Sequence, residues 1–175
     1  MIRLLLAGTF LFAWMSASTD AAEINIGYLR RVELKSTLSL LQTPANNDGL
    51  AGARLAIDDN NTTGMFLDQR FSLEDLRLAG GTDAVAATIA LVERGVSLVI
   101  ADLSADELLK AADAGASRKL LFFDVGTIDD RLREEDCRTN VIHIAPTRSM
   151  LADALAQYLV WKQWRRWLLV VGSHA

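Results

Sequence analysis

The 175-residue chain has one cysteine, two histidines and no excess of basic residues. Cys137 has no second cysteine to pair with, which excludes an internal disulfide bond and a cysteine-based zinc site. The two histidines, His143 and His174, are too few for a histidine-rich metal site. The net charge of -4 argues against a nucleic-acid partner, because such a surface needs a patch of lysine and arginine. We therefore expect no metal ion, DNA or RNA in the function of this protein.

Long apolar runs are also lacking, and this decides how the N-terminus is interpreted. The run at residues 4–15 is too short to cross a bilayer, which needs about 20 apolar residues. Arg3 precedes the run, and small and polar residues follow it at 16–22. This order is typical of a secretory signal peptide at residues 1–22, and it predicts a protein that works outside the cytoplasm. The alternative is a buried N-terminal helix.

Strand and helix patterns alternate along the rest of the chain, which is 51% hydrophobic. Apolar alternation or continuous apolar runs predict strands at 23–29, 71–78, 96–101, 120–125, 141–145 and 167–172. Helical spacing and capping residues predict helices at 48–61, 82–95, 104–115 and from 146 onward. Such alternation with short connections predicts an α/β fold with a three-layer, mostly parallel sheet.

Two local patterns add detail to this prediction. Ser104 and Glu107 have the spacing of a capping box, which predicts that a helix begins there. In the segment 71–78 the apolar residues fall out of alternation between Leu73 and Leu76, which suggests a bulge or a bend in that strand.

A ligand site is expected where the strand order of a parallel sheet reverses, at the carboxyl ends of the strands. If the order begins 2-1-3-4, the first, third and fourth strands contribute to that site. Its candidate ligand-binding residues are Arg30, Asp102, Leu103, Ser104, Gly126 and Thr127. An arginine and a helix N-terminus suit a small anionic or zwitterionic solute. The alternative is that Arg30 and Arg31 are surface charges paired with nearby carboxylates.

Patterns for catalysis and cofactors are missing. Ser173 lies between Gly172 and His174 but outside a Gly-x-Ser-x-Gly nucleophile elbow. No Gly-x-Gly-x-x-Gly sequence follows the first strand, so a dinucleotide site is not expected. We therefore expect a protein that is not an enzyme and that needs no cofactor.

Several segments, taken in order, resemble a known family. After the leader, these are residues 24–28, 48–61, 99–104, 140–147 and 164–172. Their order is similar to that in periplasmic solute-binding proteins of ABC importers, of the leucine-binding (type 1) kind. Residues 136–140 resemble more narrowly the subgroup associated with PQQ-dependent alcohol dehydrogenase systems.

This resemblance implies a two-lobed protein that closes on a solute without transforming it. The solute would be similar to a branched-chain amino acid or related to PQQ, and an ABC permease in the inner membrane would receive it. The expected division is a first lobe at 23–146, then a crossover helix and the first strand of a second lobe at 147–175. We expect a monomer that is truncated before most of the second lobe.

A stand-alone flavodoxin-like secreted domain with an enzymatic or regulatory role is the main alternative, and a sensor domain of related fold is a further one. In the flavodoxin-like arrangement, residues 167–172 pair within the same sheet as residues 96–101. In the solute-binding arrangement, they lie away from that sheet with exposed apolar side chains.

Overall fold

In a computed structural model, which describes residues 21–31, 41, 45 and 47–170, five parallel strands form one sheet. The strands are β1 (Ala22–Arg31), β2 (Gln69–Leu78), β3 (Leu98–Asp102), β4 (Leu121–Asp124) and β5 (Val141–His143). The helices are α1 (Asp48–Gly64), α2 (Ala84–Glu93), α3 (Ala105–Ala116), the 3-10 turn η1 (Asp130–Arg133) and α4 (Arg148–Trp161). The sheet order is β2-β1-β3-β4-β5, which confirms the α/β fold and the expected order. The expected signal peptide lies almost entirely outside the described residues.

The hydrophobic core lies between the sheet and the helices α2 and α3. Leu29, Val99 and Phe122 point from three neighbouring strands into this core and are fully buried. Leu91 of α2 is equally buried. Gly115 lets α3 lie close to the sheet, since a Cβ at this position would meet the Phe122 ring at 2.8 Å. This face of the sheet is therefore closed to solvent.

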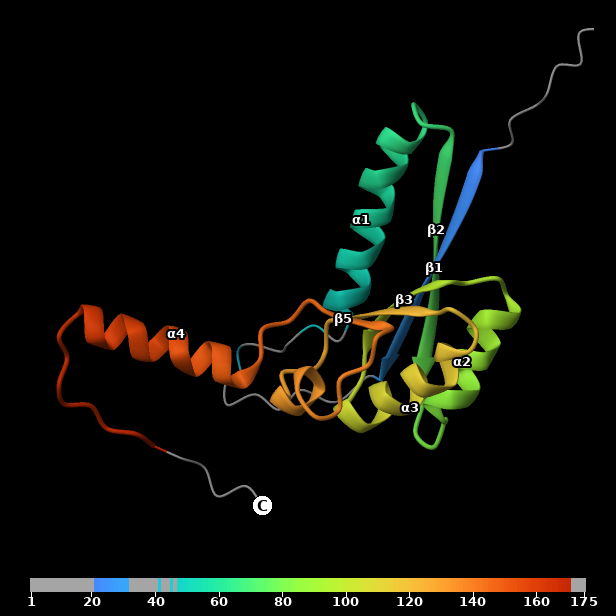
Figure 1. Cartoon of the computed structure of the whole chain (residues 1–175). Coiled ribbons are helices and arrows are strands. Elements are labelled where there is room, and N and C mark those ends of the chain that lie inside the picture. Colours follow the sequence, from blue (N-terminus) through green and yellow to red (C-terminus); the bar gives the residue numbers. More distant parts are fainter. Residues whose placement is uncertain (1–20, 32–40, 42–44, 46, 171–175) are drawn as a thin grey trace, which may run out of the picture.

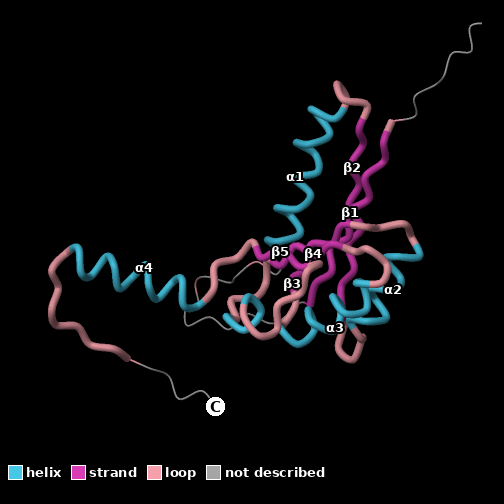
Figure 2. Tube along the Cα trace, viewed as in Figure 1, coloured by secondary structure: helices cyan, strands magenta, loops and turns pink. Residues whose placement is uncertain are grey.

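The opposite face of the sheet is covered unevenly. Helix α1 packs against β2 and covers the β1–β2 side (Figures 1 and 2). Over β3, β4 and β5, no helix of the described residues covers this face. An open apolar hollow of about 350 Å³ lies there, lined by Ile26, Leu98, Ile100, Phe123, Val125 and Ile144. The three-layer arrangement is thus complete only where α1 lies.

Strand β2 contains no bulge, so that prediction is wrong. Its pairing with β1 is continuous from Ala22 opposite Gln69 to Arg31 opposite Leu78. The apolar residues fall out of alternation because the buried face of the strand changes along its length. Phe71 lies on the side covered by α1, whereas Leu76 and Leu78 pack against the core under α2 and α3.

Helix starts were predicted with mixed success. Helix α2 begins at Ala84 and not at Thr82, because the Asp83 side chain caps it by accepting a hydrogen bond from the Val85 N–H. The capping box at the start of α3 is confirmed, with Glu107 accepting from the backbone N–H of Ser104.

The strand predicted at 167–172 is wrong over the part that the structure describes. Residues 167–170 are irregular (Figure 2), and Val171 and Gly172 lie outside the described residues. An isolated strand leaves its backbone groups without partners, and none of the described strands pairs with this segment. Its side chains are exposed, Leu168 by 88% and Val170 by 84%. This position outside the sheet is the one that the solute-binding arrangement predicts.

The Asn61 side chain joins α1 to the outer edge of β2. Its side-chain amide donates to the Phe71 carbonyl at 2.9 Å and accepts from the Phe71 N–H at 2.8 Å. These backbone groups face away from β1, so they have no strand partner. We expect Asn61→Ala to lower the free energy of unfolding by about 2 kcal/mol, for two lost hydrogen bonds.

Asn60→Ala is the matched control, because the Asn60 amide donates to the Ala56 carbonyl in its own helix and does not join α1 to β2. Its effect should stay within about 0.5 kcal/mol in the same urea denaturation. Equal losses in the two variants would contradict a role for Asn61 in fixing α1.

Candidate functional site

The carboxyl ends of β1, β3 and β4 meet at one edge of the sheet. Parallel pairing places Arg30 opposite Asp102. Gly126 lies so close to the start of the next loop that a Cβ would meet Asp102 Oδ1 at 2.8 Å and the Leu103 nitrogen at 3.0 Å. All six candidate residues follow or end these three strands: Arg30, Asp102, Leu103, Ser104, Gly126 and Thr127. The structure brings them to one edge, and their role toward a ligand stays a prediction.

Arg30 is paired with a carboxylate that the sequence analysis did not identify. Its guanidinium donates to both oxygens of Asp75, at 2.8 and 3.0 Å, and the residue is only 8% exposed. Hydrogen bonding to Arg30 lowers the pKa of Asp75, and the same bond raises the pKa of Arg30. The pairing with a carboxylate agrees with the alternative interpretation, but Arg30 is buried near the end of β1 and is not a surface charge.

Arg31 serves the start of α3. It forms an ion pair with Glu107 and also donates to the carbonyls of Ala79 and Thr82. Burial raises the pKa of Glu107, but hydrogen bonds from Arg31 and Ser104 outweigh burial, and the net effect lowers that pKa. The first turn of α3 is thus held in place by the end of β1.

Tyr28 of β1 holds the Asp102 side chain by a hydrogen bond. The Tyr28 hydroxyl donates to Asp102 Oδ2 at 3.2 Å, and the tyrosine is 2% exposed. Burial, together with the nearby Asp102 charge, raises the pKa of Tyr28 to about 12. Tyr28 therefore remains a hydrogen-bond donor at any physiological pH and fixes one oxygen of Asp102.

Thr127 faces inward and not toward solvent. Its backbone N–H donates to Asp124 Oδ1 at 3.0 Å and its hydroxyl donates to Asp124 Oδ2 at 2.5 Å. The Gly126 N–H also donates to Asp124 Oδ1, at 3.3 Å. The loop after β4 is therefore built around a buried carboxylate, with His143 on its other side at 2.9 Å.

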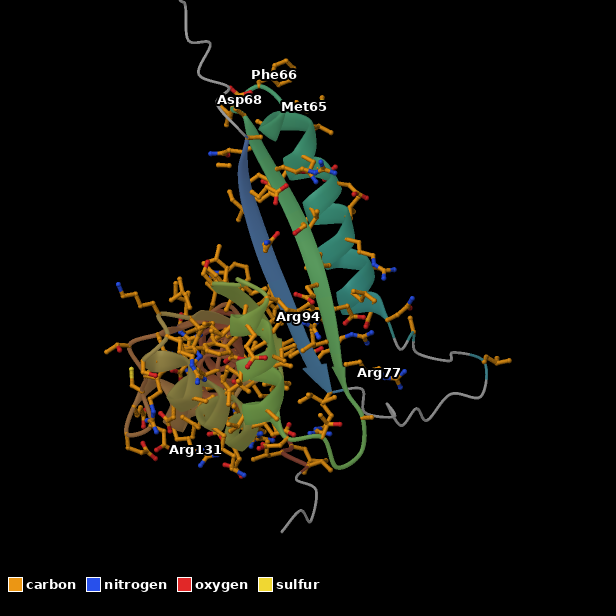
Figure 3. All side chains as sticks on the ribbon, turned by 90° about the vertical axis from the view of Figure 1, so that its right-hand side faces the viewer. Met65, Phe66, Asp68, Arg77, Arg94 and Arg131 are labelled. Carbon is orange, nitrogen blue, oxygen red and sulfur yellow. The ribbon has the colours of Figure 1, made fainter. Side chains whose placement is uncertain are left out.

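The edge combines groups of both signs. Asp102 offers carboxylate oxygens, whereas the N–H groups in the first turn of α3 offer donors. The Ser104 hydroxyl donates its hydrogen to Glu107 at 2.9 Å. Arg77 lies at the carboxyl end of β2 on the same edge, far from the exposed turn with Met65 and Phe66 (Figure 3). Such an arrangement can hold a small polar molecule by hydrogen bonds and opposite charges.

Other kinds of site have little support among the described residues. There, no three histidine, cysteine, aspartate or glutamate side chains gather as a metal would require. In the same ranges, no helix has both the length and the apolar content to cross a bilayer. Sequence reasoning missed Tyr28 and Asp75. Asp75 interrupts the apolar alternation of its strand, and this was the signal that could have identified it.

Because of the Arg30–Asp75 pair, we expect the stability of the fold to depend on pH in the acid range. Because pairing lowers the pKa of Asp75, its contribution to stability is present above about pH 4 and is lost as the pH falls further. Asp75→Asn should lower the free energy of unfolding at neutral pH by about 1–2 kcal/mol, since it leaves the buried Arg30 charge unpaired. It should also flatten the fall in stability below about pH 4.

Glu74→Gln is the control for this measurement by urea denaturation at several pH values. Glu74 pairs with Arg94, whose side chain is 53% exposed, so its effect should stay within about 0.5 kcal/mol. If the free energy of unfolding of the two variants depended on pH in the same way, the Arg30–Asp75 pair would not be the source of the stability lost in acid.

The chain is similar in sequence to a known family and in fold to several solved structures. A family model described as periplasmic binding protein matches residues 36–175. The fold is similar to an ABC transporter substrate-binding protein from Desulfitobacterium hafniense, with a TM-score of 0.62 and 19% identity over 80% of this chain and 39% of that one. No curated protein matches the sequence.

Two further solved structures have the same fold. One is the branched-chain amino acid transporter substrate binding protein LivJ from Streptococcus pneumoniae, in complex with isoleucine (TM-score 0.59, 19% identity, 79% of this chain, 38% of that chain). The other is the leucine-, isoleucine-, valine-, threonine- and alanine-binding protein from Brucella ovis (TM-score 0.60, 15% identity, 82% of this chain, 37% of that chain).

The chain spans about two fifths of the length of these structures. At such identities the likeness establishes the fold, whereas the family model covers most of the chain and establishes the family. The chain therefore belongs to the periplasmic binding protein family.

Proposed function

We propose that the chain is the N-terminal lobe of a solute-binding component of an ABC importer. It would capture a small solute in the periplasm and present it to a permease in the inner membrane. The observation that carries this proposal is the close approach of Gly126 to Asp102 and Leu103, where an added Cβ would not fit, because it brings the loops after β3 and β4 together at one edge of the sheet. Membership of a solute-binding family, and not of an enzyme class, supports it.

The proposal divides the chain into a leader at 1–22, the lobe at 23–146 and the start of a second lobe at 147–175. Helix α4 supports this division, because none of its residues is buried and it extends away from the sheet (Figure 1). The Tyr158 ring contacts the rings of Trp161 on this helix and Trp164 just after it, and all three side chains are exposed. A second lobe would cover such exposed aromatic groups.

The solute is proposed to be a zwitterion of the amino-acid type. The N–H groups at the start of α3 suit a carboxylate, and Asp102 suits an ammonium group. Asp75 neutralises Arg30, and this favours a zwitterion over a polycarboxylate such as PQQ. The isoleucine complex of the Streptococcus pneumoniae protein supports testing an aliphatic amino acid first. Arg30, Leu103, Gly126 and Thr127 would shape and support the same edge.

Ligand titrations followed by NMR test this proposal. L-leucine should shift the backbone signals of Ser104 and Gly126. Two half-analogues, 4-methylpentanoate and 3-methylbutylamine, each lack one charge and should bind at least about tenfold more weakly. Ser104→Ala should weaken leucine binding, because it removes the bond to Glu107 that holds the first turn of α3 at the carboxylate position.

Ser72→Ala is the matched control, since this serine bonds to Asn25 in the middle of the β1–β2 pair and away from the edge. Its binding should equal that of the unaltered protein. Shifts caused by PQQ and not by leucine would favour a polycarboxylate ligand, and shifts away from the edge would contradict the site.

A further inference from the structure

His143 connects three separate parts of the lobe. It ends β5, its Nδ1 atom lies 2.9 Å from Asp124 Oδ2 at the end of β4, and its Nε2 atom lies 3.1 Å from the Leu132 carbonyl in η1. The histidine side chain is 12% exposed and the Asp124 side chain 1%. The sequence analysis assigned this histidine no role, and the proposed function does not use it.

The partners of the ring determine where its hydrogens are. The Leu132 carbonyl can only accept a hydrogen bond, so Nε2 must carry a hydrogen. Asp124 already accepts from the Thr127 hydroxyl and from two backbone N–H groups, which is the bonding of an ionised carboxylate. Nδ1 must therefore donate as well. A ring that donates from both nitrogens is a charged imidazolium.

Loss of one ring proton would break this arrangement. A neutral imidazole has one donor and one acceptor, so one ring nitrogen would then face an oxygen that also only accepts. Asp124 would at the same time be a buried charge without its cationic partner, which is costly. Asp124 is also the carboxylate that holds Gly126 and Thr127. Opening of the loop at residues 125–129 would let water reach this charge, so the cost of the unpaired carboxylate favours a looser loop.

Other charged groups around the ring are already engaged. Asp136 and Arg138 line the same small void as His143, together with Leu108 and Leu109 of α3. Asp136 lies 3.4 Å from Arg131, and Arg138 forms an ion pair with Asp113 of α3. Arg133 of η1 donates to the Ala145 carbonyl at 2.7 Å. Asp124 is thus the carboxylate bonded to the ring.

We propose that His143 is a positioning residue whose doubly protonated ring holds the loop at 125–129 in its ligand-facing conformation. When the ring loses a proton, the loop that carries Gly126 and Thr127 loosens. We call the hydrogen bonds of the His143 ring to Asp124 and to the Leu132 carbonyl the latch. The inference rests on the proposed function only where loop order is taken to affect solute binding, because the latch itself does not depend on any ligand.

NMR on the ligand-free protein tests the latch. The chain has two histidines, so His174→Gln identifies the His143 ring signals. At about pH 5 both ring nitrogens of His143 should carry hydrogens. Between about pH 5 and pH 8, the range in which histidines change charge, amide exchange at Gly126 and Thr127 should rise at least about tenfold beyond the intrinsic effect of pH. The amide of Leu91, in the core, should show no such excess.

Variants separate the latch from a general loss of structure. His143→Gln keeps one donor but cannot titrate, so the excess rise at Gly126 and Thr127 should disappear. Asp124→Asn should abolish the doubly protonated ring at about pH 5, whereas Asp136→Asn should leave the unaltered behaviour. If neither His143→Gln nor Asp124→Asn folds, amide exchange at Gly126 relative to Leu91 in the unaltered protein still tests whether the loop loosens with rising pH.

A single ring hydrogen on His143 at about pH 5, or no excess exchange at Gly126, would overturn the inference. An equal effect of Asp136→Asn and Asp124→Asn would also overturn it. Leucine titrations at both pH values separate the two proposals. A pH-dependent loop without leucine binding would refute the proposed function alone, and leucine binding with a pH-independent loop would refute the latch alone.

Discussion

Parallel pairing of β1 with β2 on one side and with β3 on the other is the constraint on which the rest of this lobe depends. Parallel strands all end at the same edge, so every loop that follows a strand emerges there. This is why Arg30, Asp102 and Gly126 become neighbours although long stretches of chain separate them. It also sends the connecting helices over the faces of the sheet, where they bury apolar side chains.

The charged groups at this edge are arranged mainly to satisfy one another. Asp75 neutralises Arg30, Glu107 pairs with Arg31, and Asp124 accepts from the loop that follows it. Buried or half-buried charges require such partners, because an unpaired charge in this environment is costly. At the proposed site, a solute would therefore meet mainly the N–H groups at the start of α3, the Asp102 carboxylate and the loops that follow the strands.

Apolar surface is distributed unequally between the two faces of the sheet. Residues such as Leu29 and Phe122 are fully sealed under α2 and α3, whereas Ile144 on the other face is 59% exposed. Helix α4 adds further exposed apolar residues, including Leu155 at 59%. Contiguous apolar surfaces of this kind in a folded protein are usually contact surfaces. The structure therefore has one polar edge at the ends of the strands. It also has two exposed apolar regions, one on the open face of the sheet and one on α4.

The sequence alone determined those features that depend on near neighbours in the chain. The buried run that became β3, the capping box at Ser104 and Glu107, and the α/β order all follow from local patterns, because adjacent residues suffice to specify them. Tertiary structure decided the rest. The partner of Arg30 is 45 residues away on another strand, and no spacing rule identifies it. The apparent bulge in β2 was a change of buried face, which depends on where α1 lies. Residues 167–170 have a strand-like sequence yet form no strand, because a strand exists only where another strand satisfies its backbone hydrogen bonds.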